Sequence, residues 1–425
     1  MSAPAFSKGS GKERERPTEG ALGLYLHVPF CNYACTFCFY AKRIGASREQ
    51  MERYVKTALR ELAWVEPGTR LSQLYVGGGT PTALPAELLD EILAAVFERV
   101  QNDGSEVHTV EGSPESITPA HVDVLRGRGI ERVSMGVQSL QDGVLDAVHR
   151  RHAGEAALAA CDLLLENGLI VNVDLIYGLP GQTQEDLRRD FSAMADRGVH
   201  SVTLYNLRVN ERTPVGGTLA PEERLDLMRL VTWRAFIQRT AAELGFVQTR
   251  WHTFRRQDLG STAPPRAAQF RDMTGHGNQF GVGVSARSRL GATVYRNHPD
   301  LKTYLERVEA GQSPVEEVFP LDDEAQKIRF IGQTLGDGQA LERSAYALTF
   351  DRSFDDDFGA ALERLREAEL LQDDGHRIQL AEAGKLVYDL ITFGFYPEHV
   401  RSWLGTRQEK VGRGSRKASA RPMAS

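Results

Sequence analysis

The sequence predicts an α/β protein with a parallel sheet wrapped by helices, followed by a smaller, mainly helical domain. Two observations lead to this class. From about residue 23 to residue 250, short apolar runs alternate with amphipathic stretches, and strands separated by helices are typical of parallel sheets. After residue 250 this alternation stops and helix-like stretches predominate. The alternation alone fits either a barrel or a doubly wound sheet.

Six apolar runs are the candidate strands of the sheet. They are residues 24–28, 71–76, 107–112, 131–137, 169–178 and 200–207. The helix-like patterns between them lie at residues 47–65, 85–100, 153–168 and 185–198. Because a crossover helix returns the chain to the start of the next parallel strand, we expect all the strands to end at one edge. In parallel α/β proteins that edge carries the chemistry.

The region after residue 250 has a different organisation. Residues 251–266 combine polar residues with glycine and paired prolines, which predicts a loop. Helix-like patterns follow at residues 322–335, 358–371 and 382–395, around a short turn at residues 372–378. This order predicts a small helical domain of winged-helix-like form.

Composition divides the chain into four segments. The first and the last are rich in glycine, serine, proline and basic residues without an apolar period, which predicts mobile tails. The segments are residues 1–22 (tail), 23–250 (α/β domain), 251–405 (second region) and 406–425 (tail).

Charge and hydropathy exclude several classes of partner. The formal net charge of the 425 residues is −6, whereas nucleic-acid binders usually present a basic face. We therefore expect no nucleic-acid partner. No stretch approaches the roughly 18 to 20 apolar residues of a membrane span, and the first residues lack the apolar region of a signal peptide. These features predict a cytoplasmic protein without a membrane partner.

Three of the four cysteines lie within eight positions. Cys31, Cys35 and Cys38 form the pattern C-x3-C-x2-C directly after the first predicted strand. Thiolates on one tight loop can converge on a single soft metal centre, and thiolate ligands select zinc or iron–sulfur clusters. The pattern therefore predicts a metal site at the functional edge of the sheet.

The cysteine triplet also allows other interpretations. A structural zinc site normally needs four protein ligands, and no fourth ligand is found nearby in the sequence. Cys161 lies in an apolar helix pattern, where a buried structural thiol is expected. His149 and His152 are interpreted as a surface pair on a helix rather than as ligands. A core-packing role for the triplet and a zinc-loop interaction protein are the remaining alternatives.

Three thiolates on a four-iron cluster leave one iron open, and this stretch closely resembles the radical S-adenosylmethionine (SAM) enzymes. The resemblance implies a 4Fe-4S cluster whose open iron is chelated by the amino and carboxylate groups of SAM. It also implies that the reduced cluster cleaves SAM to a 5′-deoxyadenosyl radical. A reductant such as flavodoxin or ferredoxin is the implied electron donor.

Further candidate residues follow the other predicted strands. Gly77, Gly78 and Gly79 come directly after the second strand, where missing side chains let a ligand approach the backbone. Three polar residues stand at later strand ends and Arg150 follows on the next predicted helix. The three are Glu111, Gln138 and Asp174. Matching strand ends would bring these side chains toward the cysteine loop.

From about residue 23 to 310, the chain resembles the family of oxygen-independent coproporphyrinogen III oxidase and its relatives. The resemblance implies an incomplete parallel (β/α)6 barrel of the TIM type and two bound SAM molecules. The first, cluster-bound SAM would contact Tyr25, Gly78 and Glu111. The second would lie among Phe37, Gly79, Thr80, Gln138, Arg150 and Asp174. Gly281 and Gly283 are expected to close the site.

Departures from the family pattern decide among three branches. Tyr40 stands where the oxidases carry another cysteine, and their longer N-terminal arm is absent. Phe39 follows Cys38 where the haem chaperones usually have aspartate, and their His-Asn-x-x-Tyr-Trp segment is absent. Arg208 is expected to replace a small residue near the second SAM. The main prediction is therefore methyl or methylene transfer to an sp2 carbon of a conjugated, tetrapyrrole-like small molecule. The alternatives are oxidative decarboxylation of coproporphyrinogen III and haem trafficking.

Overall fold

The structure is a computed structural model, and it describes most of the chain. The described residues are 7–8, 21–102, 104, 106–210, 213–217, 219–220, 223–259 and 277–402. The chain divides into two compact units, Met1–Asp322 and Asp323–Ser425. In the described part of the chain, no helix is long and apolar enough to cross a membrane.

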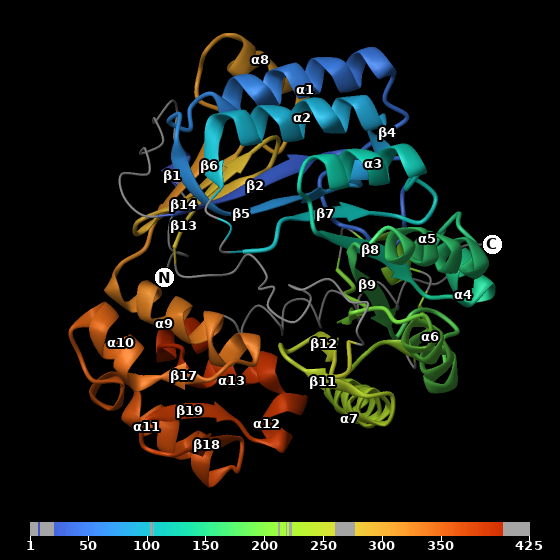
Figure 1. Ribbon diagram of the computed structural model, residues 1–425. Coiled ribbons are helices and arrows are strands. Elements are labelled where there is room, and N and C mark those ends of the chain that lie inside the picture. The colour runs from blue at the N-terminus through green and yellow to red at the C-terminus, as the bar shows by residue number, and fades with distance from the viewer. Residues whose placement is uncertain are drawn as a thin grey trace, which may run out of the picture. The chain divides into compact units, whose positions relative to one another are not determined.

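The first unit is built on one large, curved sheet with a parallel centre (Figure 1). Neighbouring strands of this centre pair in parallel, so their carboxyl ends share one edge. In spatial order these strands are β2 (Leu22–Val28), β5 (Thr69–Gly78), β7 (Thr109–Gly112), β8 (Arg132–Gln138), β9 (Ile170–Tyr177) and β10 (Ser201–Asn206). They confirm the six predicted strands and the parallel α/β class.

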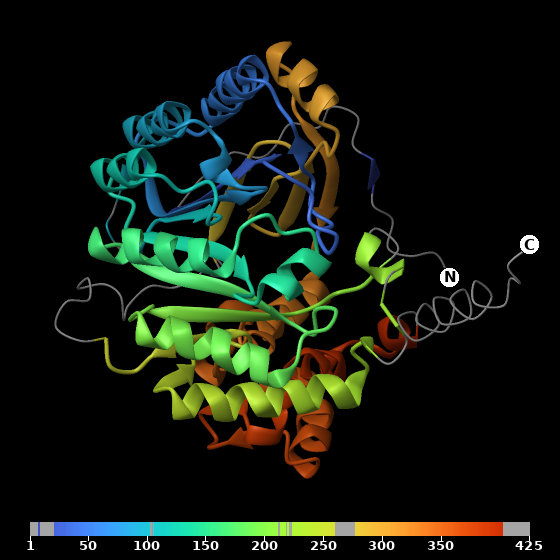
Figure 2. The same ribbon diagram turned by 90° about the vertical axis from the view of Figure 1, so that its right-hand side faces the viewer.

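Helices cover the outer face of the parallel centre (Figures 1 and 2). They are α1 (Arg48–Leu62), α2 (Ala86–Arg99), α3 (Pro119–Gly127), α4 (Asp142–Ala147), α5 (Gly154–Glu166), α6 (Gln184–Asp196) and α7 (Leu227–Glu243). Capping boxes begin two of them: Ser47 with Gln50 starts α1, and Thr183 with Asp186 starts α6. Each box satisfies backbone N–H groups that have no partner inside the helix.

The sheet extends beyond the predicted barrel on both sides. On one side, β12 (Thr253–Arg256) pairs antiparallel with β10, and β11 (Phe246–Gln248) pairs with β12. The prediction of a loop from residue 251 is therefore wrong for β12, whereas residues 260–266 lie outside the described residues. The four-residue run of β12 was too short and too basic to stand out as apolar, and its pairing with β10 stabilises it.

On the other side, a strand from far along the chain joins the first one. β13 (Asn278–Val282) pairs in parallel with β2. Antiparallel strands β14 (Arg287–Leu290), β15 (Thr293–Asn297) and β16 (Val315–Pro320) follow, with α8 (Leu301–Glu309) before β16. These hydrogen bonds explain why the first compact unit continues to Asp322, past the boundary expected at residue 250. Within the described residues, the two ends of the sheet are β1 and β11, so the barrel is open.

Short strands complete the first unit. They are β1 (Ser7–Lys8), β3 (Phe30–Cys31), β4 (Arg43–Ile44) and β6 (Val100–Asn102). β1 lies in residues 1–22, the segment expected to be a mobile tail, and it pairs with β16. Most of that segment, and all of residues 406–425, lie outside the described residues.

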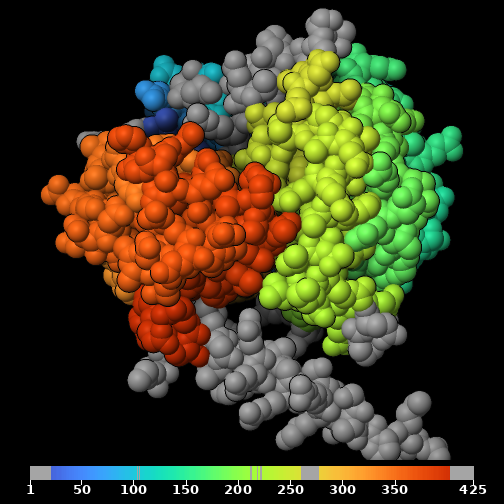
Figure 3. All heavy atoms as spheres, turned by 90° about the horizontal axis from the view of Figure 1, so that it is seen from below, coloured from blue at the N-terminus to red at the C-terminus, as the bar shows by residue number. Residues whose placement is uncertain are grey.

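The second unit has the strand and helix order of a winged helix. The elements are α9 (Asp323–Gln333), β17 (Leu341–Glu342), α10 (Arg343–Phe350), α11 (Phe354–Glu367), β18 (Leu371–Asp373), β19 (Arg377–Leu380), α12 (Glu382–Leu386) and α13 (Tyr388–Phe395). The strands form one antiparallel sheet in the order β17-β19-β18. The helix predicted at residues 382–395 is broken at Val387. Figure 3 shows this unit in orange and red, with its atoms packed into one body.

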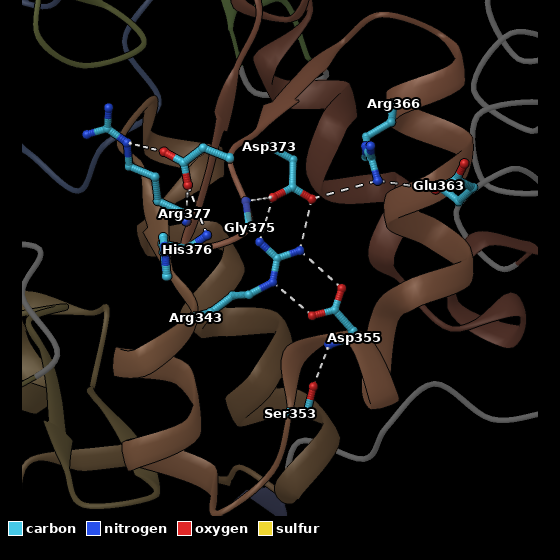
Figure 4. Close-up of polar contacts among 10 residues, drawn as sticks. Arg343, Ser353, Asp355, Glu363, Arg366, Asp373, Gly375, His376 and Arg377 are labelled. Carbon is cyan, nitrogen blue, oxygen red and sulfur yellow. Dashed lines mark hydrogen bonds and ion pairs between the residues drawn. The ribbon is translucent and has the colours of Figure 1, made fainter.

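An arginine ties three elements of the second unit together (Figure 4). Arg343, at the start of α10, donates from Nε to Asp355 Oδ2 at 2.8 Å and from Nη1 to Asp373 Oδ1 at 2.7 Å. Asp355 begins α11, and Asp373 ends β18 and also accepts from the Gly375 backbone at 2.9 Å. The guanidinium therefore joins two helix starts to the β18–β19 turn.

Candidate functional site

The cysteine loop leaves the carboxyl end of β2 and is closed at its base. Pro29 accepts a hydrogen bond from the Arg43 backbone at 2.7 Å, and β3 pairs in parallel with β4. Inside the loop, the Cys38 N–H donates to the Cys35 carbonyl at 3.3 Å. All three cysteines of the loop are free thiols and only half-buried. The backbone thus presents the three thiols from one short, folded loop.

Neighbouring segments hold the loop in place. The Thr36 N–H donates to the Val148 carbonyl at 3.2 Å, and the Thr36 carbonyl accepts from Val215 at 3.1 Å. The Lys42 ammonium donates to the Cys38 carbonyl at 2.9 Å. Since these partners come from the α4 end, from the segment after β10 and from the loop itself, the loop is anchored by distant parts of the sheet.

Gly79 allows the turn after β5 to approach the cysteine loop. The Gly79 N–H donates to the Val28 carbonyl at 2.7 Å. A Cβ at this position would lie 2.6 Å from the Phe30 carbonyl oxygen and 2.9 Å from Cys31 Sγ. Thr80, the next residue, places its hydroxyl 3.7 Å from Cys31 Sγ. The glycine is therefore required by the contact between β5 and the thiol loop.

The donor set suits a cluster that takes three thiolates. Burial raises the pKa of the Cys31 thiol to about 11, and the Thr80 hydroxyl partly opposes this shift. Such a thiol stays protonated at neutral pH until a metal displaces its proton. Among the described residues, no three histidine, cysteine or acidic side chains are grouped to hold one metal ion. A four-iron cluster makes a different demand, since each of its thiolates binds a different iron.

The fourth cysteine takes no part in the site. Cys161 lies on α5 with no exposed surface, and its sulfur is 3.9 Å from Met194 Sδ. Burial raises its pKa to about 12. The prediction of a buried structural thiol is confirmed.

Glu111 bridges two neighbouring strand ends. Its Oε1 accepts from the Tyr75 hydroxyl at 2.7 Å, and its Oε2 accepts from the Gly78 N–H at 3.0 Å. A Cβ on Gly77 would lie 2.8 Å from the same carboxyl group. Burial raises the pKa of Glu111, while these two hydrogen bonds oppose the rise. The carboxylate is thus fixed beside the glycine turn that follows β5.

Tyr25 and His27 line the end of β2. The Tyr25 hydroxyl lies 3.0 Å from His27 Nδ1, and His27 Nε2 lies 3.4 Å from the Ala41 carbonyl. Burial lowers the pKa of His27 to about 4, so the ring is neutral at pH 7. Gly78 has φ = +118°, and a Cβ there would lie 2.6 Å from the His27 ring. The neutral imidazole therefore positions Tyr25 and requires glycine at residue 78.

Gln138 ends β8, whereas Arg150 lies between α4 and α5 and not on the helix predicted from the sequence. Gln138 has φ = +72°, at an irregularity in the pairing of β8 with β9. Arg150 is buried and donates from Nη2 to the Gly136 carbonyl and from Nη1 to Cys35 Sγ at 3.5 Å. The structure therefore brings Arg150 to the cysteine loop, as the sequence predicts.

Asp174 lies on β9, and side chains of β8 and β9 hold its carboxyl group. Asn172 Nδ2 donates to Asp174 Oδ1 at 2.7 Å, and the Ser134 hydroxyl donates to Oδ2 at 3.2 Å. Burial and then the charge of Glu111 raise the pKa of Asp174 to about 7, although Arg132 and the two hydrogen bonds oppose the rise. The two carboxylates thus interact electrostatically, in agreement with their predicted convergence.

Three other predicted residues have local packing roles. Phe37 is partly buried against an apolar cluster that includes Val144, Ile176 and Val215. A Cβ on Gly281 would lie 2.3 Å from the Arg287 carbonyl oxygen. A Cβ on Gly283 would lie 2.5 Å from Tyr54 Oη. Close packing against a neighbouring strand and against α1 accounts for the two glycines, and their role in closing the site stays a prediction.

The histidine interpretation needs a correction. His149 and His152 lie between α4 and α5, not on a helix, and His152 is buried. Its Nε2 lies 3.1 Å from the Val137 carbonyl and its Nδ1 lies 3.6 Å from Glu115 Oε2. Glu115 was not singled out from the sequence, although it follows Glu111 by four residues at the same strand end. Burial raises the pKa of Glu115, but the contacts with His152 and Ser113 and the charge of Arg150 together lower it to about 2.

Comparison with known proteins identifies the class first. The family model of the radical SAM superfamily matches residues 25–194, which span the cysteine loop and the strand ends described above. The fold and the cysteine loop therefore define a radical SAM protein, whose cofactors are a 4Fe-4S cluster and SAM.

Curated relatives narrow the class. The oxygen-independent coproporphyrinogen III oxidase of Cereibacter sphaeroides is 30% identical over 329 residues, covering 72% of this chain and 71% of the relative. The haem chaperone HemW of Mycobacterium tuberculosis is 31% identical over 310 residues, covering 69% and 76%. HemW of Lactococcus lactis is 26% identical and is covered over 93% of its length. The chain belongs to the family of oxygen-independent coproporphyrinogen III oxidases and HemW haem chaperones.

A solved structure supports the fold. Coproporphyrinogen III oxidase (HemN) from Escherichia coli, a radical SAM enzyme, superposes with a TM-score of 0.78 at 24% identity. The match covers 88% of this chain and 90% of that one. The incomplete parallel barrel and the helical C-terminal region are therefore confirmed.

Proposed function

We propose that the protein is a radical SAM enzyme that oxidatively decarboxylates a propionate side chain of a porphyrinogen. The observation that carries this proposal is the cysteine loop anchored beside Glu111 and Asp174, in a chain 30% identical to an oxygen-independent coproporphyrinogen III oxidase. The comparisons give no support to methyl transfer, the main prediction from the sequence. They favour its alternatives, the oxidase and the haem chaperone.

The reaction has a simple balance. A propionate becomes a vinyl group, with loss of carbon dioxide, one hydrogen atom and one further electron. When bound, the reduced cluster would supply the electron that cleaves SAM, and the resulting 5′-deoxyadenosyl radical would accept this hydrogen atom. An electron acceptor takes the remaining electron, and a low-potential donor of the flavodoxin or ferredoxin type reduces the cluster.

The residues of this chain would bind and orient the reactants. Cys31, Cys35 and Cys38 would hold the cluster, leaving one iron open. Tyr25, Gly78 and Glu111 would contact the first SAM, since a fixed carboxylate and an open backbone suit hydroxyl and amino groups. The residues proposed for a second SAM are Phe37, Gly79, Thr80, Gln138, Arg150 and Asp174.

Haem trafficking is the second candidate function. The match to HemW of Lactococcus lactis covers 85% of this chain and almost the whole relative, at 93%. This coverage is longer than the 72% and 71% found with the Cereibacter oxidase. Against it, Phe39 stands at the position where the chaperones usually carry aspartate.

One experiment separates the candidates. Anaerobically reconstituted protein is incubated with dithionite, methyl-labelled SAM and coproporphyrinogen III, and the products are separated by chromatography. Vinyl product with one 5′-deoxyadenosine per carbon dioxide supports the proposal. Labelled product with S-adenosylhomocysteine would support methyl transfer. Absence of turnover, together with stoichiometric haem binding in a parallel titration of the same protein, would support trafficking.

A matched pair of variants provides the control. Cys35→Ala should lose the cluster and all SAM cleavage, because two thiolates hold the cluster too weakly. Cys161→Ala should keep both, because its sulfur contacts Met194 away from the site. SAM cleavage by Cys35→Ala would refute the assignment of the ligands.

A further inference from the structure

We propose that Arg150 tunes the cluster through Cys35: its buried guanidinium stabilises the reduced, more negative cluster and thereby raises the midpoint potential. The inference goes beyond the proposed function, because it concerns the entry of the electron and holds for any substrate. It also differs from the role that family resemblance assigns to Arg150, a contact with the second SAM.

The position of the guanidinium is fixed on several sides. Arg150 is 9% exposed. Its Nη2 donates to the Gly136 carbonyl, its Nη1 lies 3.5 Å from Cys35 Sγ, and its Cζ lies 5.5 Å from the centre of the Tyr33 ring. The Arg150 backbone N–H donates to the Leu145 carbonyl at 2.9 Å. These contacts orient the charge toward the sulfur.

Among the described residues, the hydrogen bonds of Arg150 do not pair its guanidinium with a carboxylate. Within the part of the chain that the structure describes, its side chain hydrogen-bonds one carbonyl and one sulfur but no carboxylate, and Nε has no hydrogen-bond partner. A buried cation that hydrogen-bonds no anion is costly, and the electrostatic interaction with Glu115 offsets only part of this cost. A thiolate bound to a reduced cluster would be an anionic partner, at hydrogen-bond distance.

The negative charge of Glu115 opposes the effect of the Arg150 charge on Cys35. Its carboxylate interacts electrostatically with both Arg150 and Cys35. Its carboxylate accepts from Ser113 Oγ at 2.5 Å and lies 3.6 Å from His152 Nδ1. A buried cation and a partly exposed anion, whose side chain is 22% exposed, therefore act on the same cluster ligand with opposite signs.

The physical consequence is a shift in redox equilibrium. One electron passes from the low-potential donor, which is oxidised, to the cluster, which is reduced, and no bond or proton changes. Reduction adds a negative charge, and a cation at the ligand sulfur favours that product, strongly so in a buried site of low dielectric. The reduction potential of an iron–sulfur cluster depends on the hydrogen bonds to its sulfurs and on its net charge.

The test is the midpoint potential of the reconstituted holoprotein, measured by redox titration with EPR detection in the absence of SAM. Arg150→Gln should make reduction about tenfold less favourable, a shift of about 59 mV to more negative potential. Glu115→Gln should shift the potential in the opposite direction. Arg151→Gln is the matched control, because this neighbouring arginine is exposed, and it should leave the potential unchanged.

The outcomes are distinguishable. An unchanged potential in Arg150→Gln with a full complement of iron would overturn the inference, as would shifts of the same sign in Arg150→Gln and Glu115→Gln. If Arg150→Gln does not retain the cluster, Arg150→Lys and Glu115→Gln decide by the sign of their shifts. Porphyrinogen turnover is not needed for any of these measurements, so failure here and failure of the proposed function are separate results.

Discussion

The Gly78 N–H donates a hydrogen bond to Glu111 Oε2 at 3.0 Å, which joins the ends of two adjacent parallel strands. The Tyr75 hydroxyl donates to the other carboxylate oxygen at 2.7 Å. The contact fixes the turn after β5 in the conformation that Gly78 adopts, with φ = +118°. Since Gly79, the next residue, touches the cysteine loop, Glu111 also helps to position the thiols.

Replacing Glu111 with Gln should weaken SAM binding at least tenfold. The amide keeps the shape of the side chain but places a donor against the Gly78 N–H or the Tyr75 hydroxyl, and an unmatched buried donor costs about 1–3 kcal/mol. Equilibrium dialysis of labelled SAM with the reconstituted variant gives the affinity. Glu166→Gln, on the exposed end of α5, is the control. Equal affinities of both variants would remove Glu111 from the SAM site.

The strand ends could be predicted because parallel strands in this chain are nearly continuous apolar runs. Leu24, Leu26, Val173 and Leu175 are examples, all without exposed surface. β13 could not be predicted in this way, because its pairing with β2 depends on residues more than 250 positions apart in the sequence. The same holds for β12, which is stabilised by β10 rather than by its own apolar pattern.

The site was predictable at the level of residue types but not of contacts. The spacing of the cysteines and the strand-end position of Glu111 were visible in the sequence. The partner of Arg150 was not, because Cys35 lies 115 residues away along the chain. The burial of His152 was hidden for a similar reason: its polar partners, Val137 and Glu115, come from β8 and from the segment after β7.

Asp174 should make stability depend on pH near neutrality. Its pKa is about 7 in the folded protein against 3.8 ordinarily, because burial and then Glu111 raise it while Arg132 opposes. The ionisable groups that interact with it are Glu111, Arg132, Tyr40 and Tyr75. Between these two pKa values the folded state binds more protons than the unfolded state, so this residue lowers stability as the pH rises toward 7.

The Asp174→Asn variant isolates this effect. The thermal midpoint of the variant relative to the native protein should rise between pH 5 and pH 8, because only the native protein has to ionise a buried carboxyl group. The hydrogen bonds with Asn172 and Ser134 set a constant offset that does not depend on pH. A difference between the two proteins that stays constant over this range would show that Asp174 titrates normally.

Arg208 and Tyr40 should govern the affinity for a substrate that carries carboxylates. Tyr40 is 60% exposed and stacks on Phe39 with ring centres 4.7 Å apart. Arg208 interacts electrostatically with the Tyr40 hydroxyl. An exposed aromatic pair beside a cation suits a flat ring with acidic substituents.

The prediction concerns binding more than chemistry. Arg208→Gln should raise KM for coproporphyrinogen III about tenfold or more, since a hydrogen bond to a charged group contributes about 1.5–3 kcal/mol. Cluster content and SAM affinity should stay as in the native protein. The exposed Arg287→Gln in β14 serves as the control. An unchanged KM, or a loss confined to SAM binding, would show that Arg208 does not contact the substrate.

The Arg343 cluster should decide the stability of the second unit (Figure 4). Arg343→Ala leaves Asp373, whose side chain is 7% exposed, without its bidentate partner at 2.7 and 2.9 Å. Within the described part of the chain, Asp373 would keep only the Gly375 N–H and the more distant Arg366 Nη1 at 3.9 Å, so the loss of the two hydrogen bonds from Arg343 should cost about 1.5–3 kcal/mol. The exposed Arg377, paired with Asp374 at 3.1 Å, offers a matched control in the same unit, and Arg377→Ala should cost about 0.5 kcal/mol or less. Hydrogen exchange of β18 and β19 reports on this unit directly. We expect faster exchange in Arg343→Ala but not in Arg377→Ala, because the ion pairs of Arg343 anchor the β18–β19 turn to the starts of α10 and α11. Equal exchange in both variants would mean that these ion pairs contribute little.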